Sequence, residues 1–202
     1  PLLFKHLKKL QEFFCDKKII LLADRYYGSV ELFRYCEMHN IKYIVRAKKN
    51  FFKHYIEKHE GEINFNINIK LDKAWIRRIK NDEVRKSMNE DPKMDIRVVR
   101  GTYTYNEKSK KKKREVTVET QYFTNLDGGF DIADIIDLYH HERWNVENAY
   151  DVLKNSLNIE QYNTHNPIGI INETMGKVIF YNIEQIIFIE SRKRIKQNKK
   201  CK

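Results

Sequence analysis

Residues 130–155 read FDIADIIDLYHHERWNVENAYDVLKN, and their periodicity predicts a helix around which the chain is organised. The apolar side chains on its packing sides are those of Ile132, Ile135, Ile136, Leu138, Val146 and Leu153. At about 100° per residue, polar and aromatic side chains fall on one narrow face, namely those of Tyr139, Arg143, Glu147, Tyr150 and Lys154. The stretch therefore predicts a helix with apolar packing sides and one polar face.

The polar face of this predicted helix joins a carboxylate to cations. Glu147 can bind a hard metal ion, and Arg143 and Lys154 beside it can bind phosphate oxygens. Such a set suits metal-assisted chemistry on a nucleic-acid backbone. A simpler interpretation of the helix alone is an ion pair between Arg143 and Glu147 on a solvated face.

A second acidic residue ends a buried-strand pattern near the start of the chain. Residues 19–29 read IILLADRYYGS, in which the apolar run predicts a buried strand that stops at Asp24. Ser29 is placed to cap the helix that follows. An acidic residue between a buried strand and a loop is a usual position for a metal ligand in an α/β fold. The alternative is an Asp that satisfies turn amides.

Together the two stretches resemble the catalytic blocks of IS4-type DDE transposases. Residues 21–29, LLADRYYGS, with the helix and the strand IKYIVRAKKN that follow them, resemble the second-aspartate block, written D-R-G-Y. Residues 142–154, ERWNVENAYDVLK, resemble the glutamate block with its Y-R-E-K signature. Arg143, Glu147 and Lys154 meet the spacing of that signature. The two blocks occur in the expected order, and with their flanking elements they cover most of the chain.

The signature also shows departures in its aromatic and glycine positions. Tyr26 stands where the family usually has Gly. The signature Tyr usually lies three residues before the Arg, where this chain has His140, while Tyr139 lies four before it. Both spacings reach the same helix face, so either ring can take the Tyr role.

The first Asp of the family pattern has no counterpart that we assign. Only Asp16 precedes Asp24, and it lies in a polar turn after a helical pattern rather than at the end of a strand. The chain also begins with Pro1 and not with Met. We therefore expect it to be the C-terminal part of a longer transposase, lacking the first catalytic Asp and inactive alone.

The predicted fold class is α/β, and the resemblance implies the second half of a ribonuclease-H-like catalytic core that is interrupted by a β-rich insertion and followed by C-terminal helices. Alternation of helix and strand predicts helices at 2–14 and 29–39 and strands at 19–23 and 41–47. Further β-like runs are expected at 63–71, 74–80, 94–105 and 114–126. A last long helix is expected to start near Pro167. The predicted domains are 1–50 (core, part), 51–128 (insertion), 129–190 (glutamate helix and C-terminal helix) and 191–202 (a basic tail, disordered by default).

Composition supports a polyanionic partner. The net charge is +11, with 41% hydrophobic and 33% charged residues. No apolar run is long enough to span a membrane, so we expect no membrane association. Three scattered Cys without metal-ligand spacing suit a reducing cytoplasm. The lysine-rich stretch 106–115 is either a solvated hairpin tip or a loop that contacts phosphates.

The resemblance implies metal-dependent phosphodiester cleavage and strand transfer, as in cut-and-paste transposition. Asp24 and Glu147 would be catalytic and would supply two of the three carboxylates that bind metal. Because the ligands are oxygens, a two-metal Mg²⁺ site is expected, with Mn²⁺ as a substitute. The implied partner is double-stranded DNA, both transposon ends and target, bound by a homodimer on paired ends. The implied location is the bacterial cytoplasm, at the nucleoid.

Candidate DNA-binding residues surround these carboxylates in the sequence. They are Arg25, Tyr139, His140, Arg143 and Lys154. Trp75 lies in the basic run 74–80, and the resemblance implies that an aromatic residue of the insertion can stack on a flipped base; the alternative is a core Trp of a small β-domain. The competing function is an inactive transposase remnant that only binds DNA.

Overall fold

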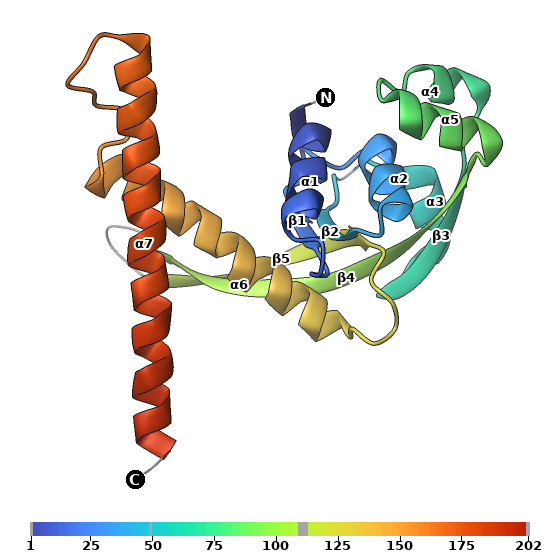
Figure 1. Ribbon diagram of the computed structural model, residues 1–202. Helices are drawn as coiled ribbons and strands as arrows, with labels where there is room; N and C mark the ends of the chain where they lie inside the picture. Colours follow the sequence, from blue (N-terminus) through green and yellow to red (C-terminus); the bar gives the residue numbers. More distant parts are fainter. Residues whose placement is uncertain (1, 49, 109–112, 201–202) are drawn as a thin grey trace. The chain divides into compact units, whose positions relative to one another are not determined.

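The computed structural model describes residues 2–48, 50–108 and 113–200. The chain forms two compact units, residues 1–143 and residues 144–202, and each is described by itself. The first unit contains a five-stranded sheet with helices on both faces (Figure 1). The predicted α/β class is therefore confirmed.

The sheet of the first unit has the strand order β1-β2-β5-β4-β3. Its strands are β1 (Ile20–Ala23), β2 (Lys42–Arg46), β3 (Asn64–Lys70), β4 (Lys93–Lys108) and β5 (Lys113–Thr124). Strands β1 and β2 are parallel, and every other neighbouring pair is antiparallel. Strands from the stretch 51–128 thus continue the same sheet as β1 and β2, while the predicted domain boundaries remain a prediction.

Five helices cover one face of this sheet. They are α1 (Leu2–Phe13), α2 (Val30–Met38), α3 (Lys53–Ile56), α4 (Lys73–Arg77) and α5 (Asp82–Glu90), with a 3₁₀ turn at Glu57–His59 after α3. Leu7, Phe33 and Met88 from these helices pack against sheet residues that include Val45 and Phe123. Burial of these side chains supplies the main hydrophobic core.

The first half of α6 (Ile132–Asp151) covers the opposite face of the sheet. Ile135 and Tyr139 pack there against Ile44 and Tyr122. Tyr43 and Val45 face the other core, because successive side chains of a strand alternate between the two faces. Burial on both faces explains why the middle of β2, from Tyr43 to Val45, is apolar without alternation.

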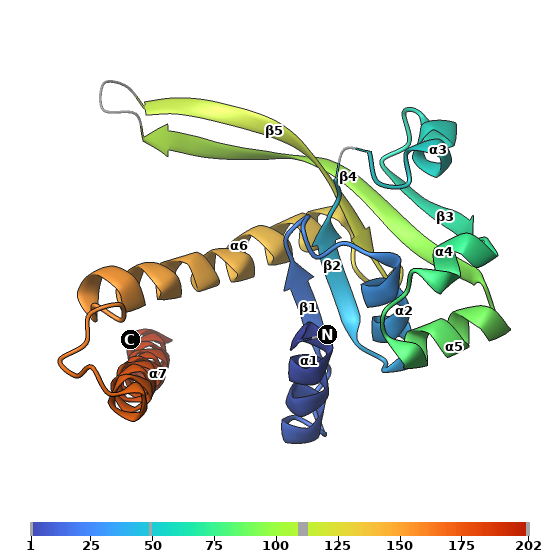
Figure 2. The same ribbon diagram turned by 90° about the horizontal axis from the view of Figure 1, so that it is seen from above.

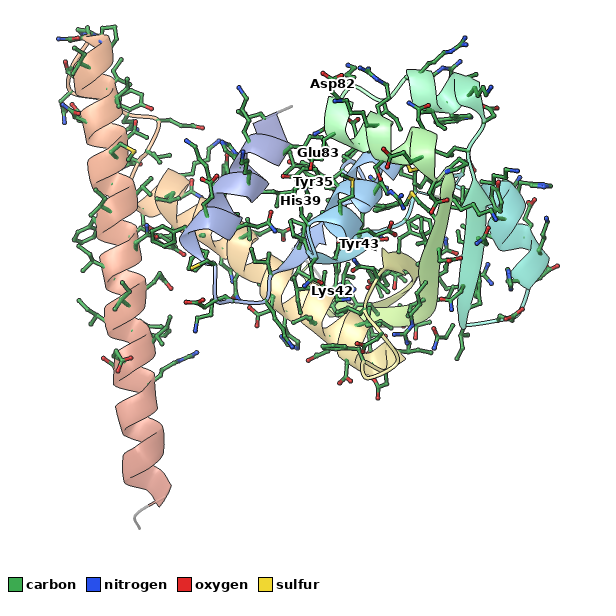
Figure 3. All side chains as sticks on the ribbon, turned by 45° about the vertical axis from the view of Figure 1, so that its right-hand side comes forward. Tyr35, His39, Lys42, Tyr43, Asp82 and Glu83 are labelled. Atoms are coloured by element: carbon green, nitrogen blue, oxygen red, sulfur yellow. The ribbon has the colours of Figure 1, made fainter. Side chains whose placement is uncertain are left out.

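Helix α2 begins and ends as the sequence predicts. The Ser29 hydroxyl accepts a hydrogen bond of 3.1 Å from the amide of Leu32, and Asn40 ends the helical stretch with a φ of 52°. At its C-terminal end, His39 Nε2 lies 3.1 Å from Glu83 of α5 (Figure 3). This contact joins the C-terminal end of α2 to α5.

One predicted strand is wrong. Residues 74–80 were expected to be extended, but α4 occupies Lys73–Arg77. The Asp72 carboxylate accepts a hydrogen bond of 2.8 Å from the amide of Trp75, which makes Asp72 the N-cap of this helix. Helix α5, capped by Asn81, was not predicted.

Strands β4 and β5 form the hairpin that the sequence predicts, paired from Arg97↔Thr124 to Lys108↔Lys113. Figure 2 shows this hairpin extending beyond the other strands of the sheet. Residues 109–112 of the lysine-rich stretch lie outside the described residues. Whether that stretch contacts phosphates therefore stays a prediction.

The second unit consists of the end of α6, a π-helical turn at Val152–Ser156, a loop and α7 (Pro167–Lys200). Helix α7 starts at the predicted Pro167. Lys177 of α7 donates hydrogen bonds of 2.8 Å and 2.6 Å to the carbonyls of Asn158 and Gln161, so it ties the loop to the helix. The disordered tail expected from residue 191 is wrong as far as Lys200, because α7 continues to that residue. Over the part of the chain that the structure describes, no helix has the length and apolar content needed to cross a membrane.

Candidate active site at the end of strand β1

Asp24 is the first residue after β1 and begins a tight turn. One carboxylate oxygen, Oδ1, accepts a hydrogen bond of 2.7 Å from the amide of Arg25. The backbone carbonyl of Asp24 accepts one of 2.9 Å from the amide of Tyr27. Asp24 therefore satisfies turn amides, and its half-buried carboxylate still has lone pairs for a further ligand.

Tyr139 connects α6 to this end of β1. Its hydroxyl donates a hydrogen bond of 3.4 Å to the carbonyl of Ala23, the residue before Asp24. The ring is 1% exposed. Burial raises the pKa of Tyr139 to about 12, against the opposing effect of Arg143, and the charge of Asp24 raises it further. The phenol is therefore protonated and acts as a donor at neutral pH.

His140 lies on the same helix but has different partners. Its Nε2 atom is hydrogen-bonded to the hydroxyl of Tyr122 at 2.7 Å, and its ring stacks on Tyr103 with centroids 3.5 Å apart. Burial first, and then the charges of Arg143 and Arg46, lower the pKa of His140 to about 4. This imidazole is neutral at pH 7.

Two arginines bring positive charge to these rings. Arg143 lies with its Cζ atom 5.6 Å from the Tyr139 ring centroid. Arg46 ends β2, the parallel neighbour of β1; its charge opposes the rise in the pKa of Tyr139 and contributes to the lowering of the pKa of His140. Sequence reasoning did not single out Arg46. The signal was available, since Arg46 closes a strand that the α/β alternation places parallel to β1, and parallel strands end at one edge of the sheet.

An open groove of about 760 Å³ runs beside this edge, and Arg25, Arg46 and Lys48 contribute to its lining. Arg100 also lines it but has structural partners. Its guanidinium donates hydrogen bonds of 2.9 Å and 3.0 Å to the carbonyls of His59 and Glu62. Glu62 and Glu119 also line the groove, so the four cations give it a net positive charge, and Arg100 fixes the backbone on one side of it.

The start of α6 is fixed by contacts of its own. Arg97 of β4 donates hydrogen bonds of 2.7 Å and 3.0 Å to the carbonyls of Asp127 and Phe130. The Asp131 carboxylate accepts one of 2.7 Å from the amide of Asp134 and caps the helix. These contacts hold the segment that connects β5 to α6, and with it the position of Tyr139.

The predicted site residues fall into two groups. Asp24, Arg25, Tyr139, His140 and Arg143 all belong to the first unit. Glu147 and Lys154 belong to the second unit. Within the continuous helix α6, the spacing of four residues keeps Tyr139, Arg143 and Glu147 on one stripe. Lys154 lies beyond that helix in the π-helical turn and forms an ion pair of 3.3 Å with Glu160. The predicted single helical face therefore stops short of Lys154.

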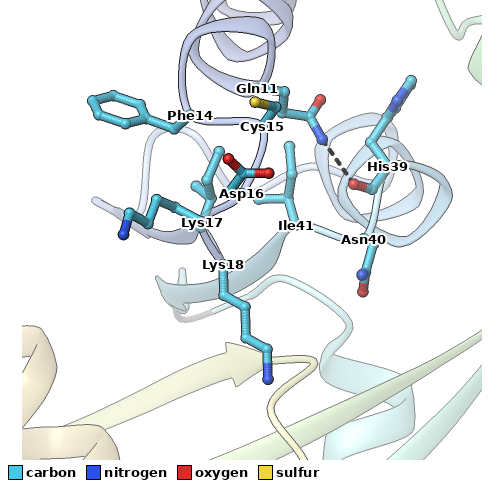
Figure 4. Close-up of a pocket in the computed structure, with 10 residues that line it drawn as sticks. Gln11, Phe14, Cys15, Asp16, Lys17, Lys18, His39, Asn40 and Ile41 are labelled. Carbon is cyan, nitrogen blue, oxygen red and sulfur yellow. Dashed lines mark hydrogen bonds between the residues drawn. The ribbon is translucent and has the colours of Figure 1, made fainter.

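Trp75 and Asp16 lie apart from this group. Trp75 of α4 is 52% exposed, with Arg78 Cζ 5.7 Å from its ring centroid, so the alternative of a core Trp is wrong. Asp16 follows α1 in a turn and lines a separate cavity of about 300 Å³ (Figure 4). Gln11, which also lines this cavity, donates a hydrogen bond of 2.8 Å to the carbonyl of His39.

The candidate site has the type of ligand that a hard divalent ion prefers, but among the described residues it has fewer carboxylates than the three expected. The side chains of Asp24 and Glu147 offer carboxylate oxygens, which Mg²⁺ prefers. Over residues 2–48, 50–108 and 113–200, no group of three or more His, Cys, Asp or Glu side chains could hold a metal ion. A complete three-carboxylate site is therefore absent from this described part.

Comparison with protein families identifies the class of this chain. The family model for the transposase DDE domain matches residues 3–183, which is most of the sequence and includes both predicted blocks. The chain belongs to this transposase family. A search of curated proteins found no match. Members of the family act on DNA and generally use a divalent metal ion, so membership supports a transposase function.

Proposed function

We propose that this chain carries part of the catalytic core of an IS4-type cut-and-paste transposase, with a ribonuclease-H-like arrangement of β1, α2, β2 and α6. The proposal rests above all on the position of Asp24, which directly follows the buried strand β1. Arg46 lies at the same edge of the sheet, and Tyr139, which contacts the residue before Asp24, belongs to the helix that also carries Glu147. The reaction is phosphodiester cleavage followed by strand transfer. The substrate is double-stranded DNA, both transposon ends and target.

In this proposal Asp24 and Glu147 are the catalytic carboxylates and bind Mg²⁺, with Mn²⁺ as a substitute. Divalent ions held by such carboxylates activate the attacking oxygen and stabilise the leaving oxygen. A third carboxylate completes the set, and Asp16, in its turn beside another cavity, is not proposed for it.

The cations of the chain bind and orient DNA. Arg143, Arg25 and Lys154 hold phosphates through charge-assisted hydrogen bonds. Tyr139 is buried and bonded to Ala23, so we assign it the positioning of α6 rather than a direct phosphate contact. His140 is the less buried of the two rings; because its Nε2 is bonded to Tyr122, the neutral imidazole donates one hydrogen bond to a DNA backbone oxygen through its Nδ1–H group.

Trp75 remains a candidate for stacking on a flipped base, because its ring is exposed and has an arginine beside it. We further propose that the protein works as a homodimer on paired transposon ends, in the bacterial cytoplasm at the nucleoid. The positive net charge of +11 supports a polyanionic partner of this kind.

The test is strand cleavage by the protein as its gene encodes it, on a plasmid that carries the element with its natural flanks. We expect Glu147→Gln to abolish Mg²⁺-dependent cleavage and to leave binding of transposon ends nearly intact. Glu142→Gln is a matched control, because it removes a carboxylate from the same helix about 140° away from Glu147. Cleavage by the Glu147 variant at the wild-type rate would refute the assignment.

A second candidate is an inactive remnant that only binds DNA. The shortage of metal-binding carboxylates among the described residues favours it. Under this alternative the protein binds DNA with an affinity that falls steeply with salt, and adding Mg²⁺ or Mn²⁺ produces no cleavage.

A further inference from the structure

Tyr26 is a large aromatic residue that the turn after Asp24 presents to solvent. Its side chain is 73% exposed. The hydrogen bond from the amide of Tyr27 to the carbonyl of Asp24 closes the turn, so Tyr26 occupies one of the two central positions. Two residues of chain span at most about 7 Å, which keeps the Tyr26 backbone beside the Asp24 carboxylate.

Two cations from different segments approach this ring. Arg25 Cζ lies 5.3 Å from the ring centroid of Tyr26, and Lys48 Nζ lies 5.6 Å from it. Arg25 precedes Tyr26 in the turn, whereas Lys48 follows β2. Both cations also line the basic groove that contains Arg46. An exposed ring, two cations and a groove therefore meet directly beside a proposed catalytic carboxylate.

This combination suits an unpaired nucleotide better than a protein or lipid partner. Every nucleobase has a flat π-face that can stack on an aromatic ring, and each nucleotide carries a phosphate for the cations. Cation–π contacts at an exposed ring are weak, whereas charge-assisted hydrogen bonds to a phosphate are strong. Arg25 and Lys48 can therefore move from the ring to the phosphates and free a ring face for the base.

We propose that Tyr26 stacks on an unpaired base next to the phosphate held at Asp24, while Arg25 and Lys48 bind the phosphates of the same strand. The ligand class is a single-stranded DNA end, bound without base preference. This inference rests on the proposed function and adds a positioning residue to it. It also differs from the stacking role suggested for Trp75, since no described contact of Trp75 reaches the Asp24 turn.

The experiment uses the 202-residue chain and a DNA duplex with a short single-stranded overhang in which one base is 2-aminopurine. Stacking on Tyr26 is expected to quench the fluorescence of the probe. We expect Tyr26→Ala to abolish the quenching and to weaken overhang binding by about tenfold, with affinity for a blunt duplex unchanged. Tyr26→Phe keeps a stacking ring and should retain both.

Tyr162→Ala is the matched control. Tyr162 also has a lysine over its ring, with Lys177 Nζ 5.6 Å from the centroid, but it lies in the second unit. This variant should behave as the wild type does. Wild-type quenching in Tyr26→Ala, or quenching that is lost only in Trp75→Ala, would overturn the inference and leave salt-dependent DNA binding in place. Absence of DNA binding by the wild type at low salt would overturn the proposed function as well.

Discussion

The hydroxyl of Tyr139 donates a hydrogen bond to the carbonyl of Ala23 at 3.4 Å, across 116 residues of sequence. Ala23 is the last residue of β1, and Asp24 follows it. The middle of α6 is thereby hydrogen-bonded directly to the residue that precedes Asp24. Positioning of Asp24 and folding of α6 onto the sheet are consequently coupled.

We predict that Tyr139→Phe costs about 0.5–1.5 kcal/mol of unfolding free energy, because it removes this hydrogen bond and keeps the packed ring. Tyr139→Ala should cost about 3–5 kcal/mol, since it also leaves a cavity against Tyr122. Urea denaturation followed by circular dichroism measures both values. Tyr150→Phe, at a 71% exposed position of the same helix, should change stability by less than about 0.5 kcal/mol. Equal losses in the two Tyr139 variants would show that the ring packing contributes nothing.

A second prediction concerns the loss of folding stability at acid pH. The folded protein lowers the pKa of His140 from 6.5 to about 4, so the unfolded chain binds one more proton than the folded chain between these values. The contribution of neutral His140 is complete above pH 6.5 and is lost as the pH falls towards 4. Wild-type stability should therefore decrease over this window more steeply than that of His140→Asn.

Denaturation midpoints measured from pH 7 to pH 4 test this difference. His165→Asn is the control, because His165 is exposed and lies in the second unit, and it is not among the groups that shift the pKa of His140. That variant should keep the steep wild-type dependence. A slope in His140→Asn that matches the wild type would mean that another group causes the acid sensitivity.

Local patterns of sequence were enough to predict the elements around Asp24. The apolar run before it and the Ser29 cap each act within a few residues, and both are confirmed. The prediction of a strand at residues 74–80 was wrong for an equally local reason. The capping signal of Asp72 outweighs the β-like side chains of Trp75 and Ile76.

The pairing of β5 with β2 could not be predicted in this way. It depends on side chains that are distant in sequence, because Asn125 accepts a hydrogen bond of 2.8 Å from the amide of Tyr43 and Thr124 donates one of 2.6 Å to its carbonyl. Periodicity reports which face of a strand is buried but not which strand lies beside it.

The third prediction tests Arg46 as a phosphate-binding residue of the basic groove. Arg46→Gln should lower the dependence of log affinity on log salt concentration by about one unit of slope, because one phosphate contact is lost. The same substitution should raise the pKa of His140, since the Arg46 charge is one of the causes that lower it. Fluorescence anisotropy with labelled duplex DNA measures the slope, and NMR titration of the His140 ring measures the pKa. Lys86→Gln on α5 removes an exposed charge away from the groove and should alter neither quantity. A variant with a raised His140 pKa and an unchanged salt slope would place Arg46 beside the rings but out of contact with DNA.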